Sequence, residues 1–321
     1  MLQPRVLFFF MFGKVIVLIT KTLKAITMIK RTIFLGNKAK ITTKYEQLCI
    51  KTEEREATIP IEDIGFVVIE SQQSFVSIPA LNKLIKKNVS VIFCDEKHMP
   101  SSMLLNLEGH HLQHEHFKNQ INASEPLKKQ IWQQVVKEKI KNQAIHLEKC
   151  GIKDNPLQYY ARTVLSGDTD NREGSAARYY WQHIFDFPFI RERKGEYPNL
   201  FLNYGYIVLR AAVARALSGS GMLNTLGIHH HNRYNAFCLA DDIMEPFRIM
   251  VDMKVMEIIK KYPEQELTTE IKAELLQVLT QTVYFEETKS PLMVALNTTC
   301  VSLQKCFAGK SRKIIYPKLW N

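Results

Sequence analysis

Residues 103–148 read MLLNLEGHHLQHEHFKNQINASEPLKKQIWQQVVKEKIKNQAIHLE, and the hydrophobic periodicity of the chain changes within this stretch. Ahead of it, short β-branched runs alternate with turn residues, which is typical of strands. Within Pro126–Glu148 the apolar residues recur at helical spacing; they are Leu127, Ile131, Val135 or Val136, Ile140 and Ala144. The sequence therefore predicts a β-rich part followed by a helical part. No proline-rich linker lies near residues 108–112, so we expect the two parts to pack together.

The β-rich part contains one predicted helix among several predicted strands. Gly36-Asn37 predicts a tight hairpin turn between the first two strands. Pro79–Ile85 has a proline near its start and apolar residues at helical spacing, which predicts a short helix. The candidate strands are Ile29–Leu35, Ala39–Thr43, Gln47–Lys51, Ala57–Pro60, Gly65–Glu70, Val89–Cys94 and Met103–Leu107. We interpret this part as a sandwich or rolled sheet.

The helical part continues to the end of the chain. Its further candidate helices are Leu202–Leu217, Cys238–Lys260, Thr268–Gln281 and Ser290–Phe307. The predicted fold class is α+β, with a small N-terminal β-rich domain, residues 28–108, packed on a larger all-helical C-terminal domain, residues 109–321. No glycine-rich phosphate loop follows a predicted strand, which argues against a Rossmann or P-loop nucleotide site.

The composition is that of a folded protein with a basic balance. Hydrophobic residues make up 46% of the 321 residues and charged residues 23%, which excludes general disorder and collagen-like or low-complexity chains. The net charge is +11, but four of these positive charges lie in residues 1–27 and five in residues 301–321. Overall basicity is therefore weak evidence for a nucleic-acid partner. The six cysteines form no C-x-x-C pair, and we expect free thiols in a reducing compartment.

Residues 1–27 differ in composition from the rest of the chain. Val6–Thr20 is apolar apart from a few positions that include Gly13 and Lys14, and no acid precedes Met28. No small-residue cleavage site follows, and a membrane span needs about 20 apolar residues, so a signal peptide or anchor is the weaker interpretation. We expect an apolar, basic extension, either disordered or outside the native protein if translation starts at Met28. No membrane partner is expected, and the segment is left out of the predicted fold.

Residues 166–181, SGDTDNREGSAARYYW, join a polar turn to small residues and then to aromatic ones. On pattern alone this is the start of a helix, capped by Asp170 or Asn171, with Glu173 in its first turn. The small residues at 174–177 also permit the close approach of another backbone. The pattern leaves a structural and a functional role for Glu173 open.

Residues 227–248, GIHHHNRYNAFCLADDIMEPFR, place carboxylates at helical spacing downstream of histidines. Asp242 and Glu245 are three apart, and Asp241 and Glu245 four apart, so each pair shares a helix face and could point at one cation. Carboxylates with a single histidine suit Mg²⁺ or Mn²⁺ better than structural zinc. The alternative is a solvated acidic helix start that ends at a proline.

A third segment, His110–His116, reads HHLQHEH. His110 and His114 are four apart, a spacing that is geometrically able to bind zinc. Because no further ligand cluster accompanies them, a polar helix face is the plainer interpretation.

From Met28 onward, the chain resembles the CRISPR-associated integrase/endonuclease family ("Cas one"), the integrase subunit of spacer acquisition. It is most similar to the type II form. The resemblance rests on NREGSAARYYW at 171–181 and GIHHHNRYNAFCLADDIMEPFR at 227–248, and the segments 128–144 and 203–217 agree with it. It implies an N-terminal β domain joined to a larger helical domain, which agrees with the periodicity.

The resemblance also implies a catalytic site. The family holds Mg²⁺ or Mn²⁺ with a glutamate, a histidine and an acidic residue. Its E-G-x-A-A, G-x-x-H and D-x-x-[DE]-P-F-R patterns fall on Glu173, His230 and Glu245. These three are the implied catalytic and metal-binding residues, with Asp242 as a supporting or second ligand. His229 and His231 match the histidine pattern less well.

The implied activity is the metal-dependent insertion of short DNA fragments, called spacers, into the CRISPR array by 3′-hydroxyl attack on a repeat-end phosphodiester. The implied partners are double-stranded DNA, a second copy of the chain and a small subunit ("Cas two"), in the cytoplasm. We expect the β domain to supply most of the homodimer contact. The arginines expected at DNA are Arg172, Arg178, Arg233 and Arg248. The alternative is a noncatalytic DNA-binding scaffold of the same fold.

Overall fold

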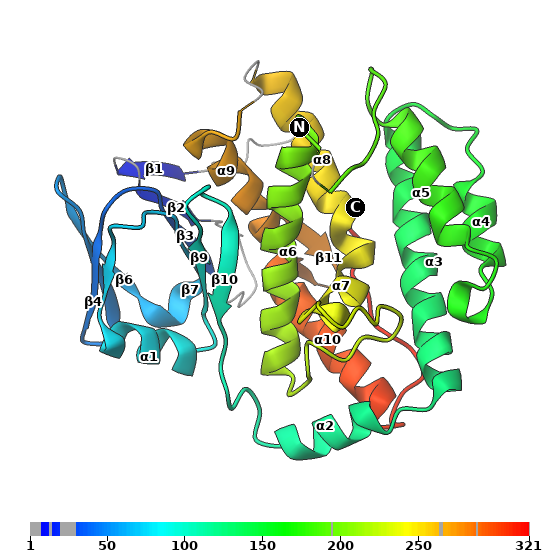
Figure 1. The fold of residues 1–321 in the computed structure, drawn as a ribbon, viewed down its shortest axis with the longest axis horizontal. Coiled ribbons are helices and arrows are strands. Elements are labelled where there is room, and N and C mark those ends of the chain that lie inside the picture. The colour runs from blue at the N-terminus through cyan, green and yellow to red at the C-terminus, as the bar shows by residue number, and fades with distance from the viewer. Residues whose placement is uncertain are drawn as a thin grey trace.

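The computed structural model describes residues 8–12, 15–19, 30–193, 195–262, 266–286 and 288–320. Two β-sheets on one side of the molecule stand against a larger group of helices (Figure 1). Helix α6 (Asn199–Gly219) runs through the middle, and helix α3 (Glu125–Lys149) lies on the side away from the sheets. This arrangement confirms the α+β fold class that the change of periodicity predicts.

The two sheets have different topologies. The larger has the strand order β1-β2-β3-β7-β9-β10, in which β3, β7 and β9 run parallel. The smaller has the order β6-β5-β4-β8. The strands are β1 (Phe8–Phe12), β2 (Val15–Ile19), β3 (Arg31–Leu35), β4 (Lys40–Lys44), β5 (Gln47–Lys51), β6 (Glu56–Pro60), β7 (Ile64–Ile69), β8 (Phe75–Val76), β9 (Ser90–Cys94) and β10 (Pro100–Leu104).

The predicted hairpin at Gly36-Asn37 is wrong. Strand β3 pairs with β2 and β7, whereas β4 pairs with β5 and β8, so the chain crosses from one sheet to the other at this point. The turn residues do separate two strands. The strand partners differ from the prediction because strand pairing depends on contacts between residues far apart in the sequence.

Alternating side chains of the larger sheet supply two separate cores. Ile33 and Leu35 lie between the sheets, where Ala80 and Leu84 of helix α1 (Ile78–Lys86) join them. Phe34 points to the opposite face and belongs to the apolar cluster of the helical part. One face of this sheet therefore forms part of the helical core.

Polar contacts also join the β-rich part to the helices. Lys272 Nζ lies 2.5 Å from Glu70 Oε1, and both side chains are buried. Arg215 Nε donates a hydrogen bond to the carbonyl oxygen of Asn88 at 2.5 Å. The two parts pack directly against each other, as the missing linker predicts. The domain division at residues 108/109 stays a prediction; it falls between the end of β10 and the start of α2.

The helical part contains α2 to α10 in the described residues. Helix α6 is long and apolar enough to span a membrane, but 78% of its apolar window is buried inside the fold, as in a core helix. The other helices are α2 (Gln113–Ile121), α4 (Leu157–Thr163), α5 (Arg172–His183), α7 (Cys238–Met244), α8 (Arg248–Lys261), α9 (Thr269–Leu276) and α10 (Leu292–Phe307).

Two expectations about the helical part are corrected. Cys238–Lys260 is not one helix, because a 3₁₀ turn at Glu245–Phe247 separates α7 from α8 where Pro246 lacks the N–H that a continuous helix needs. The C-terminal part is also not all-helical. A hairpin of β11 (Thr282–Tyr284) and β12 (Lys289–Pro291) precedes α10.

Residues 8–12 and 15–19 lie in the segment that was left out of the predicted fold, yet they form strands. β1 pairs with β2, and β2 pairs antiparallel with β3. The rest of residues 1–27 lies outside the described residues. All six cysteines are free, as expected.

Candidate active site

Glu173 lies in the first turn of α5, and local hydrogen bonds fix that turn. Asn171 has a left-handed φ of 51° and is the N-cap, with its side chain accepting from the Gly174 N–H at 3.1 Å. Asp168 accepts from the N–H groups of Arg172 at 2.9 Å and Glu173 at 3.1 Å. The cap at Asn171 confirms one of the two candidates. The role of Asp168 was missed.

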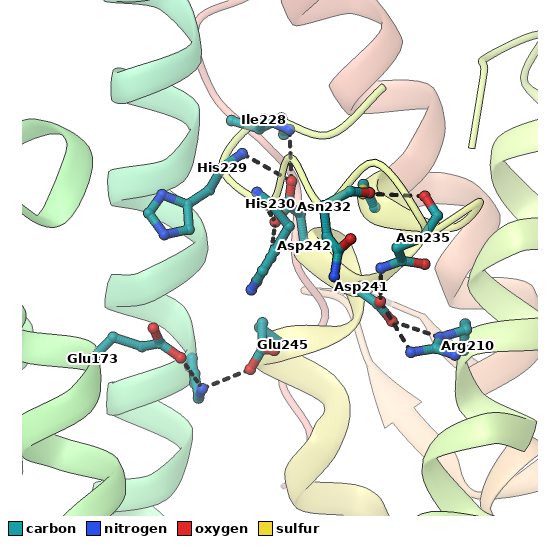
Figure 2. A network of polar contacts seen from close by, with 12 residues as sticks. Glu173, Arg210, Ile228, His229, His230, Asn232, Asn235, Asp241, Asp242 and Glu245 are labelled. Atoms are coloured by element: carbon teal, nitrogen blue, oxygen red, sulfur yellow. Dashed lines mark hydrogen bonds and ion pairs between the residues drawn. The ribbon is translucent and has the colours of Figure 1, made fainter. Parts of the chain in front are cut away.

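Glu245 begins the 3₁₀ turn and lies close to Glu173 although the two are far apart in the sequence. Lys139 of α3 stands between them, with its Nζ 2.5 Å from Glu173 Oε1 and 2.6 Å from Glu245 Oε2. The side chains of Glu173 and Glu245 reach toward this point from opposite sides (Figure 2). Two acidic side chains from different elements therefore share one buried cation.

Neighbouring cations keep Glu245 ionised despite its burial. Burial alone would raise the pKa of Glu245, but Arg248 and Lys139 outweigh burial and lower the pKa to about 2. Arg248 Nη2 lies 2.9 Å from Glu245 Oε1. Burial also opposes the charge on Lys139, yet Glu245 and Glu173 raise its pKa, so the ammonium stays charged. The centre is a compact group of paired charges.

His230 is held by Asp242. The imidazole Nδ1 is 2.5 Å from Asp242 Oδ1, and the hydrogen bond that the ring donates to Asp242 raises the pKa of His230 against the effect of burial. The Asp242 carboxylate also accepts the backbone N–H groups of Ile228, His229 and His230 at 2.6, 3.0 and 3.2 Å. A Cβ at position 227 would collide with the carbonyl oxygen of His230, which explains the glycine there.

The three consecutive histidines have different surroundings. His230 lines the same pocket as the two glutamates. The ring of His229 stacks on Trp132 with centroids 4.2 Å apart, and His231 is exposed. The geometry therefore favours His230, as the family pattern implies, over its two neighbours.

The pocket holds a cavity of about 200 Å³. Lys139, Glu173, His230 and Glu245 line it together. Three arginines also line it, namely Arg191, Arg193 and Arg248. A pocket with carboxylates, an imidazole and several guanidiniums is suited to a phosphate group held beside a cation.

The other two predicted carboxylates, Asp242 and Asp241, make hydrogen bonds or ion pairs within the protein. Asp242 is fully buried, and its oxygens are engaged with His230 and the backbone. Asp241 pairs with Arg210 at 2.6 and 3.0 Å and accepts from Asn235 at 2.7 Å. Figure 2 shows this second network beside the first. Asp241 and Glu245 therefore do not converge on one point, contrary to the i, i+4 reading.

The four arginines expected at DNA lie in different places. Arg248 is in the pocket, with its guanidinium 4.8 Å from the centre of the Tyr206 ring. Arg172 pairs with Asp170 at 2.6 Å, and Arg178 is exposed on the same helix. Arg233 is exposed and lies over the ring of Tyr234.

The donors present suit a hard divalent cation. Two carboxylates and one imidazole are ligands that Mg²⁺ or Mn²⁺ accepts. Glu245 Oε2 is buried, and the ammonium of Lys139 already lies 2.6 Å from it. Within the described residues, however, no three histidine, cysteine or acidic side chains are placed to hold a metal together. The two carboxylates and the imidazole are therefore suitable ligands for such a cation, but the ammonium of Lys139 lies between the carboxylates of Glu173 and Glu245.

The zinc reading of His110–His116 is wrong in its geometry. Helix α2 begins at Gln113, so His110 precedes the helix and shares no helix face with His114. His110 instead packs beside the ring of His116, whose Nδ1 bonds the carbonyl oxygen of Ser220 at 2.9 Å. No metal cluster occurs there in the described part of the chain.

Lys139 is a functional residue that the sequence patterns did not single out. A signal was present, because Lys139 lies four residues after Val135 and three after Val136, on the apolar face of the helix. The sequence patterns also missed Asp252, which is buried and accepts hydrogen bonds from the hydroxyls of Tyr180, at 3.2 Å, and Tyr206. Asp252 and Tyr206 lie along the same pocket.

Comparison with known proteins gives consistent matches. The model of the family described as CRISPR associated protein Cas1 matches residues 33–283. The CRISPR-associated endonuclease Cas1 of Neisseria meningitidis serogroup C (strain 8013) is 36% identical over 286 residues, which are 88% of this chain and 94% of that protein.

Two solved structures share the fold. A casposase bound to integration product matches with a TM-score of 0.74 at 20% identity, covering 88% of this chain and 92% of the casposase. A Cas6-RT-Cas1–Cas2 complex matches with a TM-score of 0.70 at 20% identity, covering 94% of this chain and 37% of that one. Since the family match spans most of the sequence and the Neisseria relative is similar over nearly its whole length, this chain belongs to the CRISPR-associated Cas1 family.

Proposed function

We propose that this chain is a metal-dependent integrase and endonuclease of CRISPR adaptation. It would insert short DNA fragments into the CRISPR array by the attack of a fragment's 3′-hydroxyl on a phosphodiester at a repeat end. One observation carries the proposal. Glu173 of α5 and Glu245 of the 3₁₀ turn contact one cation, Lys139, in a pocket that His230 also lines. Such a set beside several arginines suits phosphodiester chemistry.

Glu173, His230 and Glu245 would hold Mg²⁺ or Mn²⁺. When bound, the cation would polarise the scissile phosphate and favour the ionised form of the attacking hydroxyl. Arg191, Arg193 and Arg248 line the pocket and would bind and orient the phosphate oxygens.

His230 has one ring nitrogen left for the reaction. Its Nδ1 is hydrogen-bonded to Asp242, so Nε2 is the atom available as a metal ligand or as a proton donor to the leaving oxygen. Asp242 would act as a positioning residue by fixing the ring orientation. A metal-ligand role for Asp242 is less favoured, because its oxygens already accept from the backbone.

The reaction is a direct exchange of phosphodiester bonds. The fragment's 3′-oxygen forms a bond to phosphorus, and the bond from that phosphorus to the 3′-oxygen of the array strand breaks. The proton lost by the attacking hydroxyl is balanced by the proton gained by the leaving one. No bond to the protein forms, so no serine or tyrosine nucleophile is needed. With water as the attacking group, the same centre would be an endonuclease.

Double-stranded DNA, a second copy of the chain and a Cas2 subunit are the proposed partners, in the cytoplasm. Of the proteins that share this fold, one is a casposase bound to integration product and another belongs to a Cas6-RT-Cas1–Cas2 complex, which supports the DNA and Cas2 partners. Exposed Arg178 and Arg233 are available for phosphates. On the β-rich part, Phe75 is 74% and Ile78 67% exposed, which supports a second copy docking there.

Single substitutions of the three site residues test the proposal. We expect Glu173→Ala, His230→Ala and Glu245→Ala each to abolish strand transfer with Mg²⁺ or Mn²⁺ while DNA binding persists. Glu257→Ala is a matched control, because that glutamate lies on α8 with 59% of its side chain exposed. Retained strand transfer in all three variants would favour the noncatalytic scaffold.

A further inference from the structure

Lys139 is a buried lysine that lies between the two glutamates of the pocket. It comes from the middle of α3, is 9% exposed, and contacts both glutamates with one ammonium. The residues around it on the helix, Val136 and Ile140, are fully buried, so the side chain leaves the backbone from a packed surface. A lysine in such a place is retained only if its charge is paired.

The pairing has an electrostatic reason. Two carboxylates that approach one point repel each other unless a cation lies between them. Lys139 supplies this cation, and Arg248 covers the other oxygen of Glu245. A divalent metal held by Glu173 and Glu245 would need the carboxylate oxygens that Lys139 contacts. The ammonium and the metal are therefore competitors for the same ligands.

We propose that Lys139 is a built-in competitor of the catalytic cation. In the metal-free protein it holds Glu173 and Glu245 in place, and it leaves these oxygens when a divalent ion binds. The inference rests on the proposed function in taking the two glutamates as metal ligands. A DNA phosphate in the pocket offers the displaced ammonium a new anionic partner, so DNA and metal strengthen each other's binding.

Mn²⁺ binding to the full chain tests the competition without measuring catalysis. We expect Lys139→Met to bind Mn²⁺ about tenfold more tightly than the wild type in the absence of DNA, since the competing charge is removed. Lys139→Arg keeps the charge and should stay within about threefold of the wild type. Lys141→Met is the matched control, because Lys141 lies on the same helix with 51% of its side chain exposed. Equal or weaker binding by Lys139→Met would overturn the proposal.

Coupling to DNA gives a second readout. Adding a duplex with free 3′ ends should tighten Mn²⁺ binding in the wild type and do so less in Lys139→Met. An equal gain in both proteins would refute the coupling. Thermal unfolding is a third readout, because Lys139→Met should melt lower than the wild type without metal and gain more from saturating Mn²⁺. A variant that folds only with Mn²⁺ supports the proposal, and one that fails to fold even then contradicts it.

Glu173→Gln and Glu245→Gln, each measured as a single variant, separate this inference from the proposed function. If Mn²⁺ binding by the wild type does not depend on Glu173 or Glu245, the proposed metal centre fails and the inference fails with it. If binding depends on both glutamates but is unchanged in Lys139→Met, the metal centre stands and only the role of Lys139 is lost.

Discussion

The imidazole Nδ1 of His230 lies 2.5 Å from Oδ1 of Asp242, and the Asp242 carboxylate also accepts three consecutive backbone N–H groups. One fully buried carboxylate therefore fixes both the loop that carries the histidine and the orientation of its ring. Any catalytic role of His230 therefore depends on the Asp242 carboxylate, which orients its ring, as well as on the histidine itself.

Asp242→Asn should weaken that anchor. The hydrogen bond that His230 makes to Asp242 is the largest cause of the raised pKa of His230, and burial opposes it, so we expect that pKa to fall in the variant. An NMR titration of the His230 ring measures the change. Asp241→Asn is the control, since Asp241 pairs with Arg210 and should leave that pKa unchanged. A His230 pKa that is the same in Asp242→Asn and the wild type would contradict the prediction.

The cap of α5 should contribute measurably to stability. Asn171→Ala removes the acceptor for the Gly174 N–H and forces alanine into a left-handed φ of 51°, so we expect a loss of about 1–2 kcal/mol in the free energy of unfolding. Asn171→Gly also lacks the acceptor but tolerates that φ and should lose less. Urea unfolding measures both. Equal losses would show that the backbone conformation contributes nothing.

Asp252 should make stability depend on pH. Burial raises its pKa from 3.8 to about 7, and the hydrogen bonds from Tyr206 and Tyr180 offset only part of that rise. The folded protein then keeps a proton that the unfolded chain releases, so this contribution is complete below pH 3.8 and is lost as the pH rises through about 7.

The Asp252→Asn variant has no carboxyl group at this position, so it should not show that loss of stability as the pH rises. Relative to the wild type, its free energy of unfolding should rise with pH by up to about 1.4 kcal/mol per unit inside this window. Urea unfolding at about pH 4.5 and about pH 8 tests this, because the window lies largely between those values. A constant difference between the two proteins would contradict the raised pKa.

The ion pair between Lys272 and Glu70 should be costly to break from one side. Both side chains are 6% exposed, so Lys272→Met leaves the buried Glu70 carboxylate without its lysine. The remaining partner is the half-exposed His98, whose Nδ1 lies 3.1 Å from Glu70 Oε1, and we expect a loss of up to about 3–5 kcal/mol. The double variant Lys272→Met/Glu70→Gln should lose less than the sum of the single changes. If the losses in the free energy of unfolding are additive, the ion pair between the two residues does not stabilise the packing of the sheet on the helix.

A second copy of the chain should dock on the β-rich part. Phe75→Glu places a charge on the exposed patch at Phe75 and Ile78 and should shift the protein toward monomer in sedimentation. Leu107→Glu is the control, because Leu107 is 87% exposed but lies outside the sheets. An unchanged dimer in Phe75→Glu would place the contact elsewhere.

Much of the fold could be predicted from local pattern. The helical spacing in Pro126–Glu148 predicted α3, and the strand runs before Gly109 predicted most strands within a few residues, because both patterns depend on neighbours in the chain. Sheet assignment at Gly36-Asn37 and the break at Glu245–Phe247 were missed. The first depends on distant partners, and the second on one proline in an otherwise continuous helical pattern.

The site divides in the same way. Short-range patterns in the sequence were enough to place Glu173 in the first turn of a capped helix and Glu245 three residues after Asp242, directly before a proline. Contacts between distant segments place His230 rather than His229 along the pocket and hydrogen-bond its ring to Asp242. Such contacts also place Lys139 between the two glutamates. These contacts join α3, α5, the 227–231 turn and the α7–α8 junction, so they form only once burial brings distant segments together and requires every buried charge to be paired.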